Sequence, residues 1–148
     1  MGTVVTIATS LGALFFVDSG SGLVWFATLV KPALVPPEWT FALIWVALYV
    51  LMTFALAVVW TTQQSPEREG WVRFYFIQIL FITMWVIFLF GLHSILISFI
   101  DMLFSAFIIS ALIASAWEID RRASYLLAPC FACALFFAYL NLIIWFMN

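Results

Sequence analysis

Aromatic side chains with polar edges recur at helical spacing between residues 31 and 52, in the stretch KPALVPPEWTFALIWVALYVLM. Steps of three and four residues place on one side of a helix Trp45, Leu48, Tyr49 and Met52. Indole and phenol rings combine a large apolar body with one hydrogen-bonding group. Such a face either lines a pocket for a hydrophobic ligand or packs against a neighbouring helix.

Two polar side chains inside other apolar stretches are further candidates for a functional site. Gln78 shares a helix face with Ile82 and Trp85, and its amide needs a partner within the bundle because lipid offers none. Asp101 lies well inside the next apolar stretch, where a charged carboxylate costs several kcal/mol. It is either a functional intramembrane acid or a protonated or hydrogen-bonded packing group. The same side of its helix carries Ser94, Ser98 and Ser105.

The two cysteines, Cys130 and Cys133, form a CxxC spacing inside an apolar stretch. No second pair completes a zinc set and no histidine follows for haem attachment, so buried thiols without reactivity fit the pattern better. His93 is the single histidine, either a solvated turn residue or an axial haem ligand. We predict no catalytic residues and no metal site, because no set of nucleophile and base and no phosphate-binding loop occurs.

Composition places these residues in a membrane protein. Of 148 residues, 68% are hydrophobic and 8% are charged, which is more apolar surface than a soluble domain of this size can bury. A net charge of -2 without a basic cluster excludes nucleic-acid binding. We expect one all-α domain over residues 1–148, a five-transmembrane-helix bundle. Its spans are expected at about 3–17, 39–62, 71–92, 95–117 and 123–146.

The connections between the spans set the expected orientation. The segment from Asp18 to Gly22 interrupts the first span, and a proline-stiffened loop runs on to about Glu38. Most basic residues fall in loops on the N-terminal side: Arg68, Arg73, Arg121 and Arg122. We therefore expect a cytoplasmic N-terminus, with the first loop and the C-terminus on the opposite side of the membrane. No basic residue precedes Lys31, so the first apolar stretch should remain as an anchor.

The motif KPxxxPPxWxFxxxWxxLYxLM in the opening stretch resembles the signature of the TspO/MBR family of tryptophan-rich sensory and translocator proteins. Residues 74–85, FYFIQILFITMW, are similar to the family's third-helix pattern FYxxQxxFNxxW. Asp101 resembles an acidic position of its fourth helix, and residues 129–141 match the fifth-helix pattern in spacing. The resemblance extends over about residues 31–141.

The resemblance implies a five-helix bundle, usually dimeric, that binds porphyrins and haem in a pocket beneath the first loop. Some members of the family bind sterols or benzodiazepine-type ligands. Trp45 and Tyr49 would line this pocket, with Trp39 near its lid. Gln78 and Trp85 would contribute from the third span.

The chain departs from the family pattern at positions that would touch a ligand. The family's third-helix Asn is Ile82 here, and its fifth-helix Tyr and Trp are Cys130 and Cys133. Each exchange removes a hydrogen-bonding or stacking group, so we expect a more apolar pocket that is roomier beside the fifth span.

The expected function is therefore binding of a flat hydrophobic ligand within the membrane. By the resemblance, this is expected to be a bacterial inner membrane, with the first loop and the C-terminus periplasmic. The ligand would be a porphyrin or haem-type tetrapyrrole or a sterol, without a covalently bound cofactor. The protein would act as sensor, chaperone or transporter, with the lipid bilayer and a second copy of the chain as partners. The alternatives are a porphyrin-degrading membrane enzyme and a ligand-free protein that works through contacts between helices.

Overall fold

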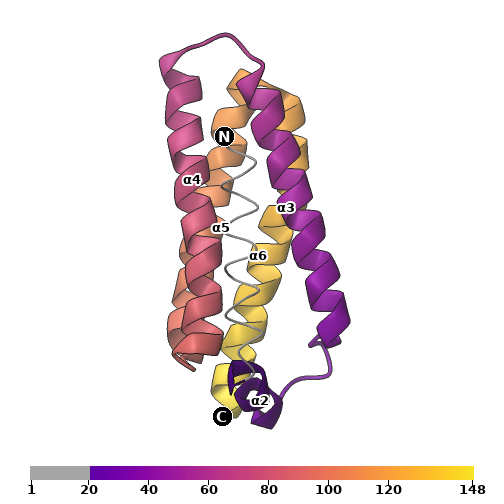
Figure 1. Cartoon of the computed structure of the whole chain (residues 1–148). Coiled ribbons are helices and arrows are strands. Elements are labelled where there is room, and N and C mark those ends of the chain that lie inside the picture. Colours follow the sequence, from indigo (N-terminus) through magenta and orange to yellow (C-terminus); the bar gives the residue numbers. More distant parts are fainter. Residues whose placement is uncertain (1–20) are drawn as a thin grey trace.

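The computed structural model describes residues 21–148, which form helices joined by short connections (Figure 1). The order is α2 (Ser21–Thr28), α3 (Glu38–Trp60), α4 (Pro66–Val86), the π-helical turn η1 (Ile87–Gly91), α5 (Ile95–Ile119) and α6 (Arg121–Met147). This part of the chain contains no strand, so the expected all-α class is confirmed. The first expected span, residues 3–17, lies outside the described residues.

Within residues 21–148, four helices are long and apolar enough to cross a membrane: Trp39–Trp60, Pro66–Gly91, Ile95–Ile119 and Arg121–Met147. Their lengths of 22 to 27 residues suit a bilayer core, which needs about 20 residues of helix. These ranges overlap the second to fifth expected spans. The bundle is therefore that of an integral membrane protein.

The helix α4 begins before the apolar run that predicted its span, because its first turn is capped by polar residues. Ser65 is extended, and its hydroxyl oxygen accepts a hydrogen bond from the Arg68 amide at 3.3 Å. Pro66 occupies the first helical turn, where its missing N–H costs nothing. The helix thus begins at Pro66, five residues before the apolar run that starts at Trp71. Asp120 caps the start of α6 in a similar way.

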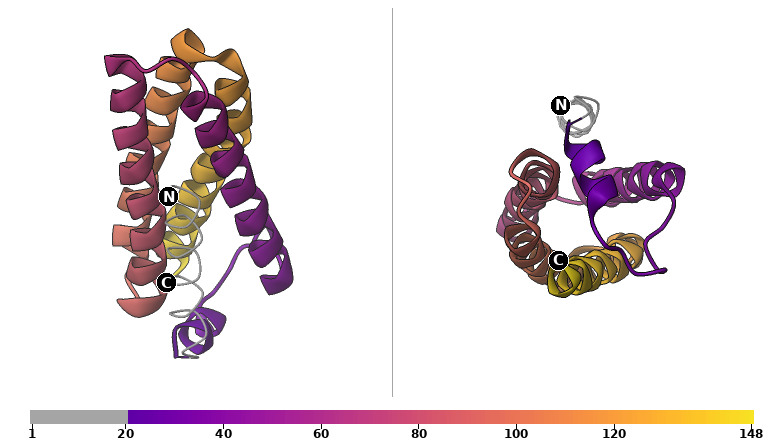
Figure 2. Two further views of the ribbon diagram at one scale, coloured as in Figure 1. Left: turned by 45° about the horizontal axis from the view of Figure 1, so that its top comes forward. Right: turned by 90° about the horizontal axis from the view of Figure 1, so that it is seen from below.

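The long helices stand side by side, with α5 between α4 and α6 and with α3 packed against α6 (Figure 2). Two side-chain hydrogen bonds tie α4 to α5. The Trp71 indole N–H donates to the Leu112 carbonyl at 2.9 Å, and the Gln78 amide donates to the Ser105 hydroxyl at 2.6 Å. Buried polar groups in lipid need such partners, so these bonds fix how the two helices align.

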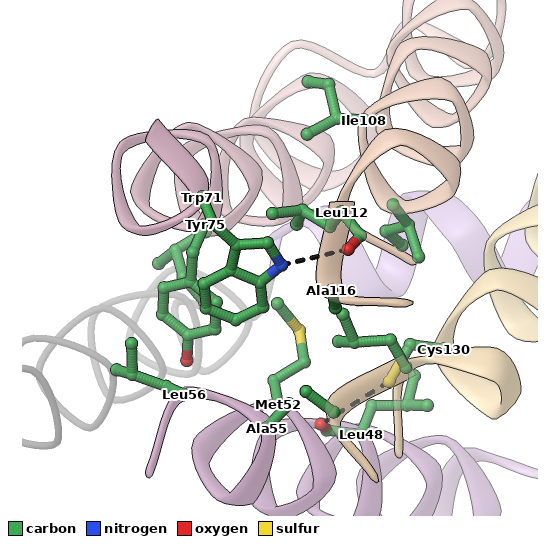
Figure 3. Packing of buried hydrophobic residues seen from close by; sticks show 14 of the residues in the cluster. Leu48, Met52, Ala55, Leu56, Trp71, Tyr75, Ile108, Leu112, Ala116 and Cys130 are labelled. Atoms are coloured by element: carbon green, nitrogen blue, oxygen red, sulfur yellow. Dashed lines mark hydrogen bonds between the residues drawn. The ribbon is translucent and has the colours of Figure 1, made fainter. Parts of the chain in front are cut away.

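A buried apolar cluster fills the half of the bundle that lies toward the α3–α4 connection (Figure 3). Met52, Trp71 and Leu112 bring side chains from three helices together there, each at most 2% exposed. Ala55 and Ala116 are fully buried and let the backbones approach closely. Large side chains packed between small residues therefore fill this half of the bundle.

We expected residues 18–38 to form an irregular loop without a helix, and the structure differs from this expectation. Residues 21–28 instead form α2, which lies across the end of the bundle (Figure 1). A helix this short is unstable alone, so it depends on tertiary contact. Trp25 and Phe26 supply that contact, because both pack against the bundle core.

Candidate functional site

Aromatic rings from three helices meet in one cluster beneath the first loop. The rings of Trp45 (α3) and Phe137 (α6) are nearly parallel, with centroids 5.6 Å apart and an angle of 5°. Trp85 (α4) lies 5.3 Å from Trp45 and 5.8 Å from Phe137. Tyr49 and Phe41 extend the cluster at 6.1 Å from Trp45 and 5.3 Å from Phe137 respectively. We call these five residues the aromatic cluster.

The cluster has a buried wall and a more open edge. Trp85 and Phe137 are each only 2% exposed, whereas Trp45 and Tyr49 are partly buried. Ring faces at an edge of this kind can stack on a flat conjugated ligand, because offset stacking is the preferred contact between π-systems. The chemistry available here is binding by apolar and stacking contact.

The first loop covers this cluster. Trp25, Phe26, Leu29 and Val35 are partly buried and pack against the core cluster that contains Trp85 and Phe137. Phe26 meets Phe90 of η1 edge-on at 5.5 Å, and Phe90 in turn meets Trp85 edge-on at 6.1 Å. A continuous line of rings therefore connects the loop to the wall of the aromatic cluster.

Close backbone approach holds α2 against η1. A Cβ atom at Gly22 would clash with the backbone carbonyl of Phe90, so only glycine fits at this contact. His93, just after η1, has a positive φ of 52° and stacks on the Trp25 ring at 4.5 Å. The single histidine is thus part of the loop contact.

Asn148 ties the other side of the loop to the end of α6. Its side-chain oxygen accepts a hydrogen bond from the Val30 amide at 2.9 Å. Its amide donates to the Val30 carbonyl at 3.0 Å and to the Ile144 carbonyl at 2.8 Å. The loop is therefore anchored at both of its sides.

The structure brings together only some of the residues that the sequence singled out. Trp45, Tyr49 and Trp85 belong to the aromatic cluster, and half-buried Cys133 packs against both core clusters. Trp39 is 68% exposed at the start of α3.

The remaining candidates lie deeper or belong to the other core cluster. Ile82 and Cys130 are buried in the cluster around Met52, Trp71 and Leu112, and Gln78 is a fully buried polar residue of α4. The Cys130 thiol faces the Leu48 carbonyl at 3.9 Å, and both cysteines are free. Across residues 21–148, no three potential metal-binding side chains come together.

Asp101 is 4% exposed on the inner side of α5, and the nearby serines do not satisfy it. Ser98 donates to the Ser94 carbonyl, and Ser105 accepts from Gln78. In the described part of the chain, several buried polar atoms have no hydrogen-bond partner: Gln78 Oε1, Trp85 Nε1, Asp101 Oδ2 and Asn141 Nδ2. Such atoms mark places where water or a ligand group is needed.

Sequence reasoning missed Phe41 and Phe137. Phe137 follows Cys133 by one helical turn and so shares its face, which is the signal that could have found it. Phe41 precedes Trp45 by one turn on α3 in the same way.

Membrane-length apolar helices around an aromatic cluster, covered by a tethered loop, define a polytopic α-helical membrane protein. Residues 2–146 match the TspO/MBR family, and the chain belongs to that family.

Individual relatives come from distant organisms. The chain is 34% identical to the tryptophan-rich protein TspO of Chlorobaculum tepidum over 126 residues, covering 84% of this chain and 79% of the relative. It is 30% identical to the translocator protein of Sus scrofa over 146 residues, covering 95% of this chain and 85% of the relative. It is 29% identical to the TspO protein of Archaeoglobus fulgidus, covering 90% and 86%.

Proposed function

We propose that the protein binds a flat hydrophobic ligand, of the porphyrin type in preference to a sterol, at the aromatic cluster. Binding would let the protein act as a sensor, chaperone or transporter for that ligand. The observation that carries the proposal is the partly buried Trp45 ring, stacked on Phe137 and flanked by Trp85.

A flat conjugated ligand suits this arrangement better than a sterol. Stacked aromatic pairs add about 0.5–1.5 kcal/mol beyond the apolar area they bury, and a conjugated macrocycle offers such a face. A saturated sterol gains only the area term. The name of the Sus scrofa relative, translocator protein, agrees with a protein that moves a small molecule.

The test is titration of detergent-solubilised protein with protoporphyrin IX, followed through its absorbance band. Trp45→Ala removes one ring of the stacked pair and should weaken binding about tenfold or more, from the loss of stacking and buried area. Trp60→Ala is the matched control, because Trp60 lies on the same helix but is 59% exposed and outside the cluster.

Saturable binding in the parent protein that Trp60→Ala leaves intact and Trp45→Ala weakens would support the proposal. Absence of saturable binding in the parent protein rejects it. Equal weakening by both substitutions would indicate that the ligand does not bind at the aromatic cluster.

The proposed orientation has support from charge. Arg68 and Arg121 lie at the end of the bundle where α3 meets α4 and α5 meets α6, and Lys31 lies at the other end beside Phe26. We propose that the arginine end is cytoplasmic. Single cysteines at Gln64 and at Leu34, in a variant lacking both native cysteines, should react with an impermeant maleimide from opposite sides of the membrane.

A further inference from the structure

Three buried polar side chains, one each from α4, α5 and α6, leave a polar atom unpaired. The atoms are Nε1 of Trp85, Oδ2 of Asp101 and Nδ2 of Asn141, which have no hydrogen-bond partner among residues 21–148. These residues are only 2%, 4% and 3% exposed. Each buried group without a partner costs free energy, so such atoms indicate a site for a hydrogen-bonding molecule.

The register between α4 and α5 brings two of these side chains to one level. Two hydrogen bonds set that register, in the pairs Trp71–Leu112 and Gln78–Ser105. Between the pairs the residue number rises by seven on α4 and falls by seven on α5, about two helical turns. A further step of seven places Trp85 opposite Ser98, one turn from Asp101. Side chains lean toward the N-terminus of their own helix, so Trp85 and Asp101 lean toward each other.

The helix α6 brings Asn141 to the same level. The Ser124 hydroxyl donates to the Ile113 carbonyl at 2.8 Å, which sets the register between α5 and α6. Counting from this pair places Asn141 opposite the first turn of α5. Asn141 also follows Phe137 by one turn, and the Phe137 ring lies 5.8 Å from the Trp85 ring. The three unpaired groups therefore belong to one region between three helices.

The unpaired groups differ in hydrogen-bonding character. The Trp85 indole N–H and the Asn141 amide are donors, whereas the Asp101 carboxyl oxygen can accept. A cation would face two donors, and an anion would face the carboxyl group. Ser98 adds a further acceptor, because its O–H donates to the Ser94 carbonyl at 2.7 Å and its oxygen can still accept. A small neutral molecule that both accepts and donates complements this set.

We propose that one ordered water molecule binds here and bridges Trp85, Asp101 and Asn141. Its oxygen accepts from the two N–H groups, and one of its hydrogens is donated to Asp101. Buried waters make about three such bonds. Small buried side chains of α5 and α6, Ser98 and Ala138, accompany it at this level. Asp101 is then a positioning residue, which acts through the water on the indole of Trp85 in the wall of the aromatic cluster.

The test is NMR spectroscopy of the full chain in detergent micelles, with ¹⁵N-labelled tryptophan and without added ligand. The Trp85 indole N–H, assigned by its absence in Trp85→Phe, should show a through-space contact with a water proton. The sign of the cross-peak in the rotating frame distinguishes such a contact from chemical exchange. The Trp71 indole is the control in the same spectrum, since it is equally buried but donates to the Leu112 carbonyl. It should show no water contact.

Three substitutions test the assignment of the water's partners. Asp101→Leu removes the acceptor, so the water contact at Trp85 should be lost. Asp101→Asn keeps a side-chain oxygen and should keep the contact, which also shows that a carboxyl proton does not relay it. Ser98→Ala removes the nearest hydroxyl of α5 and should keep the contact, because three partners of the water remain.

Absence of a water contact at Trp85 in the parent protein would overturn the proposal, and so would an equal contact at Trp71. Loss of the contact in Ser98→Ala would assign it to the serine hydroxyl instead of a water. Persistence in Asp101→Leu would remove Asp101 from the site. The parent spectrum needs no substitution, so the proposal can be refuted even if a variant fails to fold. Failure of porphyrin binding would change none of these outcomes, because no ligand is added.

Discussion

Replacing Asn148 with Ala should release the first loop from the end of α6. The substitution removes the two hydrogen bonds to Val30 and the one to the Ile144 carbonyl, at 2.9, 3.0 and 2.8 Å. A hydrogen bond of this kind contributes about 0.5–1.5 kcal/mol net, and an exposed one lies near the lower end. The two bonds that hold the loop should therefore contribute about 1–2 kcal/mol, or about 5-fold to 30-fold in the opening equilibrium.

The assay is hydrogen exchange of the Val30 amide in detergent micelles, because this amide is itself the donor to Asn148. Exchange should be about 5-fold to 30-fold faster in Asn148→Ala than in the parent. Asn148→Asp keeps an oxygen that can accept from the Val30 amide. It replaces the donating NH2 group with a second oxygen, which would repel the Val30 and Ile144 carbonyls, so this variant should also speed exchange. Phe146→Ala is the control, since Phe146 is 74% exposed and makes none of these bonds.

Exchange in Asn148→Ala within a factor of about two of the parent would refute the reasoning, because the two loop bonds would then contribute almost nothing. Equal acceleration by Phe146→Ala would show that any change near the end of α6 frays it. In that case the specific hydrogen bonds would not be the cause.

Two further changes probe contacts within the bundle. Gly22→Ala should displace α2 and cost about 1–3 kcal/mol of loop docking, measured as faster exchange in α2, because its Cβ would clash with Phe90. Gly91→Ala, whose nearest neighbour is 3.7 Å away, should leave that exchange unchanged. Gln78→Leu and Ser105→Ala should show a coupling of about 0.6–1.7 kcal/mol in a double-mutant cycle of unfolding in mixed micelles. Additive effects of the pair would contradict the contribution of their hydrogen bond.

The apolar runs were enough to predict most of the helices, because a membrane span must satisfy its own backbone and be of bilayer length. On α3, the residues predicted to share a face include Trp45 and Tyr49, whose rings adjoin each other, and Trp45 also adjoins Trp85. Helical spacing alone decides which residues of one helix share a side. The sequence could therefore predict these aromatic faces before any helix was placed.

Contacts between helices could not be predicted in the same way. Phe137 is one of 17 phenylalanines, and its selection as the stacking partner of Trp45 depends on where α3 crosses α6. Gln78 was expected to need a partner inside the bundle, but spacing along one helix cannot identify that partner as Ser105. The helix α2 was missed because its stability comes from packing on η1 and not from its own eight residues.

The π-helical turn η1 makes the docking of the loop depend on residue count. In this wider turn the Leu92 amide donates to the Ile87 carbonyl at 2.8 Å, five residues back instead of four. The extra residue rotates everything after it by about 100° relative to a regular α-helix. Deleting Leu89 from this turn would therefore rotate the His93 segment away from Trp25 while every aromatic ring in the chain stayed present. The number of residues in this turn therefore determines where the loop docks, as much as the side chains that contact it do.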